Sequence, residues 1–123
     1  MRRNGIALAA LLLAGGAASA TPSGAPQLRC GWLDNGTPGN FELLDRTDQW
    51  TIAEQGGYQA DGFDAMPDMS SKGTVLTNGS HGFSCACITA IFDRAEHKVV
   101  RVIRAEPRPL RQCRADRRLR KMQ

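Results

Sequence analysis

Few side chains of this sequence are suited to catalysis, and those few are scattered along the chain. The sequence contains two histidines, His81 and His97, and both stand among turn-forming residues. A general base needs a positioned partner within hydrogen-bond reach, and an exposed turn histidine is more often an ordinary surface residue. We therefore predict no catalytic histidine.

Carboxylates gather between residues 54 and 68. Glu54, Asp61 and Asp64 would be the acids of a small hydrolase, which needs two carboxyl groups at a fixed separation with different pKa values. Nothing in their spacing fixes such a pair, so a hydrolase is only our second alternative. Asp61, Asp64 and Asp68 also resemble a cation loop loosely, but the EF-hand register and its terminal Glu are missing. Turn formation is the simpler explanation.

Metal-binding side chains show no convincing spacing. Met66, Met69 and His81 could in principle hold copper, although methionines in a loop are more often packing residues. Zinc sites typically pair two short cysteine spacings, whereas Cys85 and Cys87 form one C-x-C. We predict no metal and no cofactor.

The four cysteines are better explained as two disulfides. Cys85 and Cys87 are two residues apart on a predicted strand, so they share a face and cannot bond each other without strain. A hairpin centred near residue 96 places residue 85 opposite about residue 106 and residue 87 opposite about residue 104. Cys113 is then nearer Cys85. We favour Cys85–Cys113 and Cys30–Cys87, with the swapped pairing left open, and each bond should add ~2–4 kcal/mol of stability.

The first twenty residues have the composition of a secretory signal. A basic start with Arg2 and Arg3 precedes an apolar stretch over residues 6–13 and small residues ending at Ala20. We predict a Sec-type signal peptide over residues 1–20, cleaved after Ala20, and hence a periplasmic or secreted protein. No later stretch is long and apolar enough to span a membrane, and disulfides persist in such compartments.

Short apolar segments separated by turn residues predict a mainly β (β-rich α+β) fold. We expect a flexible leader over residues 21–28 and a single disulfide-crosslinked domain over residues 29–123. That domain should be a small antiparallel sheet with a short C-terminal helix. Prolines at 107 and 109 should end the last strand, in which Val100, Val102 and Arg104 would face one side and Val99, Arg101 and Ile103 the other. The predicted strands are residues 29–35, 41–44, 49–53, 74–77, 83–92 and 99–105, and the predicted helix is residues 110–121.

The segment over residues 55–82 is rich in glycine and turn residues, and only residues 74–77 resemble a strand. Long irregular segments in compact domains are often binding loops. We take it as the candidate binding loop, with Tyr58, Asp61, Asp64, Asp68 and His81 as contact residues. The aromatic residues of the chain could form the core or a carbohydrate-binding face, and the sequence does not separate these options.

Charge is distributed unevenly along the chain. Residues 94–123 carry 11 bases and three acids, whereas residues 21–93 carry three bases and nine acids. On a helix, four basic residues would form one stripe that could bind an anionic polymer: Arg111, Arg114, Arg118 and Lys121. The alternative is a solvated face that pairs with the acidic first part of the chain.

Several ordered motifs resemble a small secreted bacterial family, domain of unknown function 4087. They are residues 30–35 (CGWLDN), 37–40 (TPGN), 50–52 (WTI), 55–62 (QGGYQADG), 85–87 (CAC) and 109–114 (PLRQCR). The chain departs from the family pattern at Gly36, where a proline is expected. The resemblance implies a cysteine-crosslinked envelope protein and brings no known activity or assigned site.

We therefore expect a non-catalytic, periplasmic binding or envelope-associated module. Its partner would be an envelope protein or an anionic envelope polymer, and the sequence indicates no oligomeric state. The first alternative is an inhibitor-type interaction module that blocks a wall hydrolase with residues 55–82.

Overall fold

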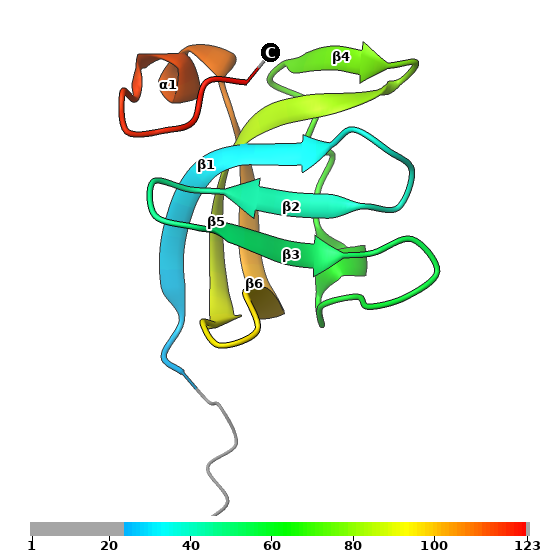
Figure 1. Cartoon of the computed structure of the whole chain (residues 1–123), viewed down its shortest axis with the longest axis vertical. Helices are drawn as coiled ribbons and strands as arrows, with labels where there is room; N and C mark the ends of the chain where they lie inside the picture. The colour runs from blue at the N-terminus through cyan, green and yellow to red at the C-terminus, as the bar shows by residue number, and fades with distance from the viewer. Residues whose placement is uncertain (1–23, 123) are drawn as a thin grey trace, which may run out of the picture.

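The computed structural model describes residues 24–122, which form one six-stranded sheet and little helix (Figure 1). This confirms the predicted mainly β fold with a short C-terminal helix. The predicted signal peptide, residues 1–20, lies outside the described residues. The elements are β1 (Gln27–Asn35), β2 (Phe41–Leu44), β3 (Gln49–Ala53), the 3-10 helix η1 (Phe63–Ala65), β4 (Thr74–Asn78), β5 (His81–Asp93), β6 (Lys98–Arg108) and α1 (Leu110–Ala115).

Five of the strands close into a ring. The sheet order is β1-β2-β3-β6-β5-β4, and β1 pairs with β5 as well as with β2. The long strand β5 pairs with β1 along one edge, while β4 and β6 share its other edge. All pairs are antiparallel except β3 with β6, which meet at Thr51 and Lys98 in parallel. The predicted antiparallel sheet is wrong at this pair, because ring closure rather than a hairpin brings these two strands together.

Two bulges shift the register of the β5–β6 hairpin. Cys85 lies opposite Arg108 and Cys87 opposite Glu106, two residues beyond the predicted partners. Irregularities between Thr89 and Ala90 and between Ile91 and Phe92 each add one residue to β6. The predicted alternation in β6 is therefore wrong. Its buried residues are Val99, Val102 and Ala105, and Ile103 is exposed.

Three predicted boundaries also need correction. Strand β1 begins at Gln27, because its first residues pair with β5, so the predicted leader over residues 21–28 runs two residues too far. Strand β6 continues through Pro107. Among the described strands only β5 pairs with β6 at this residue, so no strand on the other edge requires the N–H that proline lacks. Helix α1 ends at Ala115 rather than at residue 121, because Leu119 folds back into the core.

The core has two parts. Inward-facing side chains of the ring strands form the first cluster, and its largest fully buried members are Trp50, Leu43, Ile52, Ile88 and Val99. The second cluster lies between the sheet and the C-terminal segment (residues 116–122) and contains Trp32, Leu44, Phe83, Cys85, Cys113 and Leu119. All seven aromatic residues of the chain belong to these clusters or pack against them, so packing accounts for them.

Both expected disulfides are present. Cys30 and Cys87 lie directly opposite each other on β1 and β5, with Cα atoms 4.0 Å apart. Cys85–Cys113 ties α1 to β5, with Cα atoms 5.7 Å apart. Two disulfides fit an extracellular or periplasmic protein. Over residues 24–122, neither helical segment has the length and apolar character needed to cross a bilayer.

Candidate functional site

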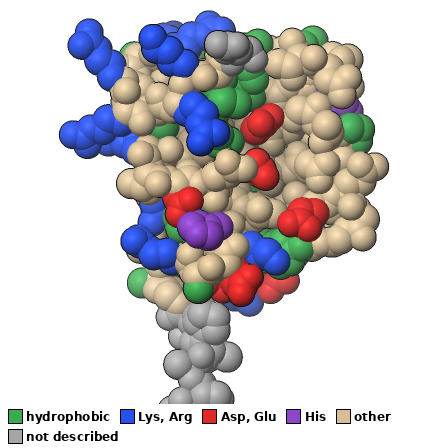
Figure 2. Space-filling view, viewed as in Figure 1, with side chains coloured by type: hydrophobic (Ala, Val, Ile, Leu, Met, Phe, Trp, Pro, Cys, Tyr) green, Lys and Arg blue, Asp and Glu red, His purple; other side chains and the backbone are tan. Residues whose placement is uncertain are grey.

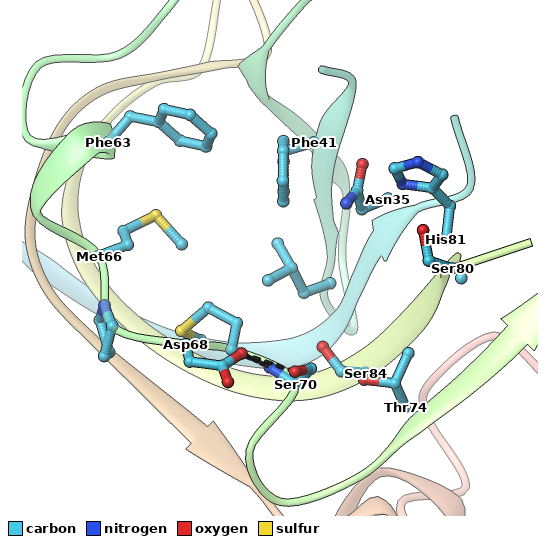
Figure 3. A pocket seen from close by; sticks show the side chains of 14 residues that line it. Asn35, Phe41, Phe63, Met66, Asp68, Ser70, Thr74, Ser80, His81 and Ser84 are labelled. Carbon is cyan, nitrogen blue, oxygen red and sulfur yellow. Dashed lines mark hydrogen bonds between the residues drawn. The ribbon is translucent and has the colours of Figure 1, made fainter. Parts of the chain in front are cut away.

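A cavity of about 410 Å³ lies beside the first residues of β5 (Figure 3). Its walls are the end of β1 and the first residues of β2, β4 and β5, and residues 63–70 complete it. From here on we call this space the cavity. Its lining residues are Leu33, Asn35, Phe41, Phe63, Met66, Pro67, Asp68, Met69, Ser70, Thr74, Ser80, His81, Gly82 and Ser84.

One side of the cavity is apolar. Phe41 from β2 and Phe63 from η1 pack edge to face with ring centroids 4.9 Å apart, and Met66 follows along the same segment (Figure 3). Gly62 makes this arrangement possible. Its φ of 80° begins η1, and a Cβ atom there would lie 2.3 Å from the Val102 carbonyl oxygen. A side chain at Gly62 would therefore push η1 away from β6.

The other side of the cavity is polar. Thr74 on β4 lies opposite Ser84 on β5, and His81 begins β5. Thr74 Oγ1 and His81 Nδ1 are both buried and have no hydrogen-bond partner among the described residues. A buried polar atom without a partner lowers stability by about 1–3 kcal/mol. Such atoms are uncommon in native proteins, and two of the three found in residues 24–122 belong to residues that line this cavity.

The cavity contains little charge. No Lys or Arg of residues 24–122 lines it, and its one carboxylate is Asp68. Asp68 Oδ1 accepts hydrogen bonds from the Ser70 hydroxyl (2.6 Å) and the Ser70 N–H (3.0 Å), and these two bonds lower the pKa of Asp68. One oxygen of the carboxylate, Oδ1, is thus already hydrogen-bonded. The lining suits an uncharged group with an apolar part and one hydrogen-bonding edge.

Of the five predicted loop residues, two reach the cavity. Asp68 and His81 line it, whereas Tyr58, Asp61 and Asp64 do not. The Tyr58 hydroxyl donates to the Val99 carbonyl oxygen, and burial, followed by the charges of Asp61 and Asp93, raises its pKa. Tyr58 is therefore placed as a packing residue of the ring.

Asp61 and Asp64 have local structural contacts. The Asp61 backbone bonds to β6, and its exposed carboxylate lies 3.8 Å from Arg101. Asp64 accepts a hydrogen bond from the Gln59 amide at 2.8 Å. Backbone bonds to β3 and β6 thus hold residues 58–61 of the predicted binding loop against the ring.

The structure does not group the hydrolase residues, and it brings the copper candidates to one cavity without placing them in one site. Glu54, Asp61 and Asp64 all lie outside the cavity lining. Met66, Met69 and His81 all line the cavity. Met66 and His81 stand on opposite sides of the cavity and do not point toward each other (Figure 3). Within the described part of the chain, no three His, Cys, Asp or Glu side chains are grouped as a metal site would need.

The sequence reasoning missed Asn35, Phe41, Thr74 and Ser84 as cavity residues. One signal was available. Ser84 is a polar residue between the apolar residues Phe83 and Cys85, and it is 6% exposed. Asn35 and Phe41 flank a turn and could be placed at the cavity only once the pairing of β1 with β5 was known.

The predicted stripe of basic residues is not helical. Arg111 and Arg114 lie on α1, but Arg118 and Lys121 follow the end of the helix. Asp116, the residue after the helix, has an extended backbone. The Leu119 N–H donates a hydrogen bond to the Asp116 carbonyl oxygen and so forms a turn. The four side chains therefore do not share one helical face. Arg114 and Lys121 border one groove, and Arg118 borders another.

Fold and site together define a small, disulfide-crosslinked β protein with a cavity that has one apolar and one polar side. The chain belongs to the family described as "Protein of unknown function (DUF4087)", whose profile matches residues 25–120. This confirms the resemblance noted from the motifs. No curated protein and no solved structure matches the chain.

Proposed function

We propose that this protein is a non-catalytic binding module that holds an uncharged, partly apolar group in the cavity. The observation that supports this most is that two residues of the cavity wall, Thr74 and His81, each have a buried polar atom without a hydrogen-bond partner among residues 24–122. A small turn of either side chain toward the cavity would let a bound group pair with that atom and remove the penalty of about 1–3 kcal/mol that each unpaired buried atom carries. Binding is favoured accordingly.

The size and lining of the cavity support the same proposal. About 410 Å³ lies in the range of roughly 300–1,000 Å³ typical of small-ligand sites, and it also suits one large side chain of a partner. Phe41, Phe63 and Met66 would contact the apolar part of the ligand. The polar edge formed by Thr74, His81 and Ser84 would set its orientation.

An extracytoplasmic location is part of this proposal. The predicted signal peptide over residues 1–20 and the two disulfides favour a module that works in the periplasm or outside the cell. The inhibitor-type alternative would present residues 55–82 as a protruding loop. Residues 58–61 of that segment instead bond to β3 and β6, and residues 74–78 pair with β5, which favours a concave site over a protruding loop.

The test is a titration followed by ¹⁵N–¹H NMR spectra. The probes are uncharged aromatic amides and alcohols, led by N-acetylphenylalanine amide, which combines an apolar ring with hydrogen-bonding groups. We expect saturable shifts confined to residues of the cavity, including Thr74, His81 and Ser84. If none of the probes shifts these residues, or if shifts spread evenly over the surface, the proposed function is wrong.

A further inference from the structure

A second concave surface lies on the opposite side of β5 from the ring interior. It is a groove of about 650 Å³ between the C-terminal segment and the outer side of the sheet, and we call it the basic groove. Trp32 and Phe83 form its floor, with ring centroids 5.2 Å apart in an edge-to-face contact. The other apolar lining residues are Val75, Leu119 and Met122.

Four exposed cations border this apolar floor: Arg114, Arg117, Arg120 and Lys121. The acid of the groove is Asp116, and Arg46 already binds its carboxylate at 2.7 Å. The groove therefore presents unneutralised positive charge. Figure 2 shows Lys and Arg side chains gathered around α1 and the C-terminal end, with hydrophobic side chains beside them.

The structure fixes the backbone that carries these cations. The Cys85–Cys113 disulfide fixes α1 to β5, and Leu119 is buried in the second core cluster. The Trp32 indole N–H donates to the Arg120 carbonyl oxygen at 3.0 Å, across 88 residues of sequence. The basic residues are thus part of a shaped surface rather than a freely moving end of the chain.

We propose that the basic groove binds an anionic lipid of the envelope. The lipid phosphate would contact Arg117, Arg120 and Lys121, and the first part of an acyl chain would lie against Val75 and Met122, which are the partly exposed apolar residues of the groove. Arginine and lysine are suited to phosphate, and apolar surface beside a cationic rim is typical of membrane-surface contacts. A soluble polyanion would need the cations but would gain nothing from the apolar floor.

The test is co-sedimentation of the disulfide-bonded protein with vesicles. The vesicles contain either phosphatidylcholine alone or phosphatidylcholine with phosphatidylglycerol. We expect binding to the anionic vesicles only, weakened by salt because exposed charges are screened. The Arg117→Gln, Arg120→Gln, Lys121→Gln triple variant should bind on the order of 100-fold more weakly, given the usual contribution of each cation near an anionic surface.

A matched variant and an apolar variant make the test specific. The control replaces three exposed cations outside the groove, Lys72→Gln, Arg94→Gln and Arg101→Gln, and should lose far less binding. Met122→Ser should weaken vesicle binding about tenfold while leaving binding to polyphosphate unchanged. Equal loss in both triple variants, or no vesicle binding by the parent protein, would overturn the proposal. If Met122→Ser affects neither ligand while the groove cations are needed for both, the ligand is a soluble polyanion and the lipid assignment is wrong.

Discussion

Thr74 on β4 lies directly opposite Ser84 on β5, and both residues line the cavity. Ser84 is buried, and the Thr74 hydroxyl oxygen is buried without a hydrogen-bond partner in the described part of the chain. Polar groups in such positions lower the stability of a small protein unless something pairs with them. Buried polar groups that lower stability in this way are most often found at functional sites.

Thr74→Val should stabilise the ligand-free protein. Valine keeps the β-branched shape that suits a strand and removes the unpaired hydroxyl, so we expect a gain of about 1 kcal/mol in the free energy of unfolding. Urea denaturation measures this, with Thr77→Val on the exposed part of β4 as the control. A loss of stability in Thr74→Val larger than in the control would show that the hydroxyl has a partner in the free protein.

Asp45 should make folding sensitive to acid. Burial raises its pKa, but four hydrogen bonds lower the pKa by more than burial raises it. They come from the N–H groups of Thr47 and Asp48 and from the side chains of Arg29 and Trp50, and the pKa of Asp45 therefore lies below its usual value. A carboxyl group with a lowered folded-state pKa stabilises the fold above its unfolded-state pKa of about 4, and this contribution disappears as pH falls through the folded-state pKa.

Asp45→Asn tests this assignment. It should lower stability at pH 7 by about 2 kcal/mol, because the largely buried Arg29 loses its carboxylate partner at 2.8 Å. Below about pH 4, the stability of the variant should also fall less steeply than that of the parent protein. The exposed Asp64→Asn is the control. An acid transition in Asp45→Asn identical to that of the parent would contradict the role given to Asp45.

Removing the Cys85–Cys113 disulfide should loosen the C-terminal segment. The double change Cys85→Ala, Cys113→Ala should lower stability by about 3 kcal/mol, because the bond closes a loop of 28 residues. Amide exchange should rise over residues 110–122, and binding to anionic vesicles should fall. Probe binding in the cavity should persist, since neither cysteine lines it. Loss of both binding activities together would show that the two surfaces are not independent.

Gly31→Ala should disrupt the contact between β1 and β2. A Cβ atom at Gly31 would lie 2.0 Å from the Leu44 carbonyl oxygen, so the strands must separate. We expect a loss of about 3 kcal/mol, at the upper end of overpacking changes. Gly57→Ala, whose Cβ would meet only Glu54 side-chain atoms at 3.7 Å, is the matched control and should stay within about 0.5 kcal/mol. Equal stability of the two variants would contradict the close packing at Gly31.

Most of the strands could be predicted from local sequence because each lies between turn signals. The apolar run from Phe83 to Phe92 predicted a strand over residues 83–92, and this strand is the main part of β5. The β6 register could not be predicted, because its two bulges are set by packing against β5 rather than by any local residue type. The predicted cysteine pairing is nevertheless correct, because Cys113 follows the end of β6 in both the predicted and the observed register.

The cavity was only half predictable. Asp68 and His81 were found because turn-rich segments often bind ligands, but Thr74 and Ser84 have ordinary strand surroundings in the sequence. Their importance comes from the pairing of β4 with β5. The helix over residues 110–121 was overpredicted for a similar reason. Burial of Leu119 against Trp32 outweighs the helical propensity of the arginine-rich segment.

The measurement that tests the central claim most directly is the affinity of N-acetylphenylalanine amide for the parent protein, Thr74→Val and Thr77→Val. If the cavity binds its ligand through the Thr74 hydroxyl, Thr74→Val should bind about tenfold more weakly, the usual worth of one buried hydrogen bond, while being the more stable protein. Thr77→Val should bind like the parent. Equal affinities for the three proteins, or equal weakening in both variants, would contradict the account.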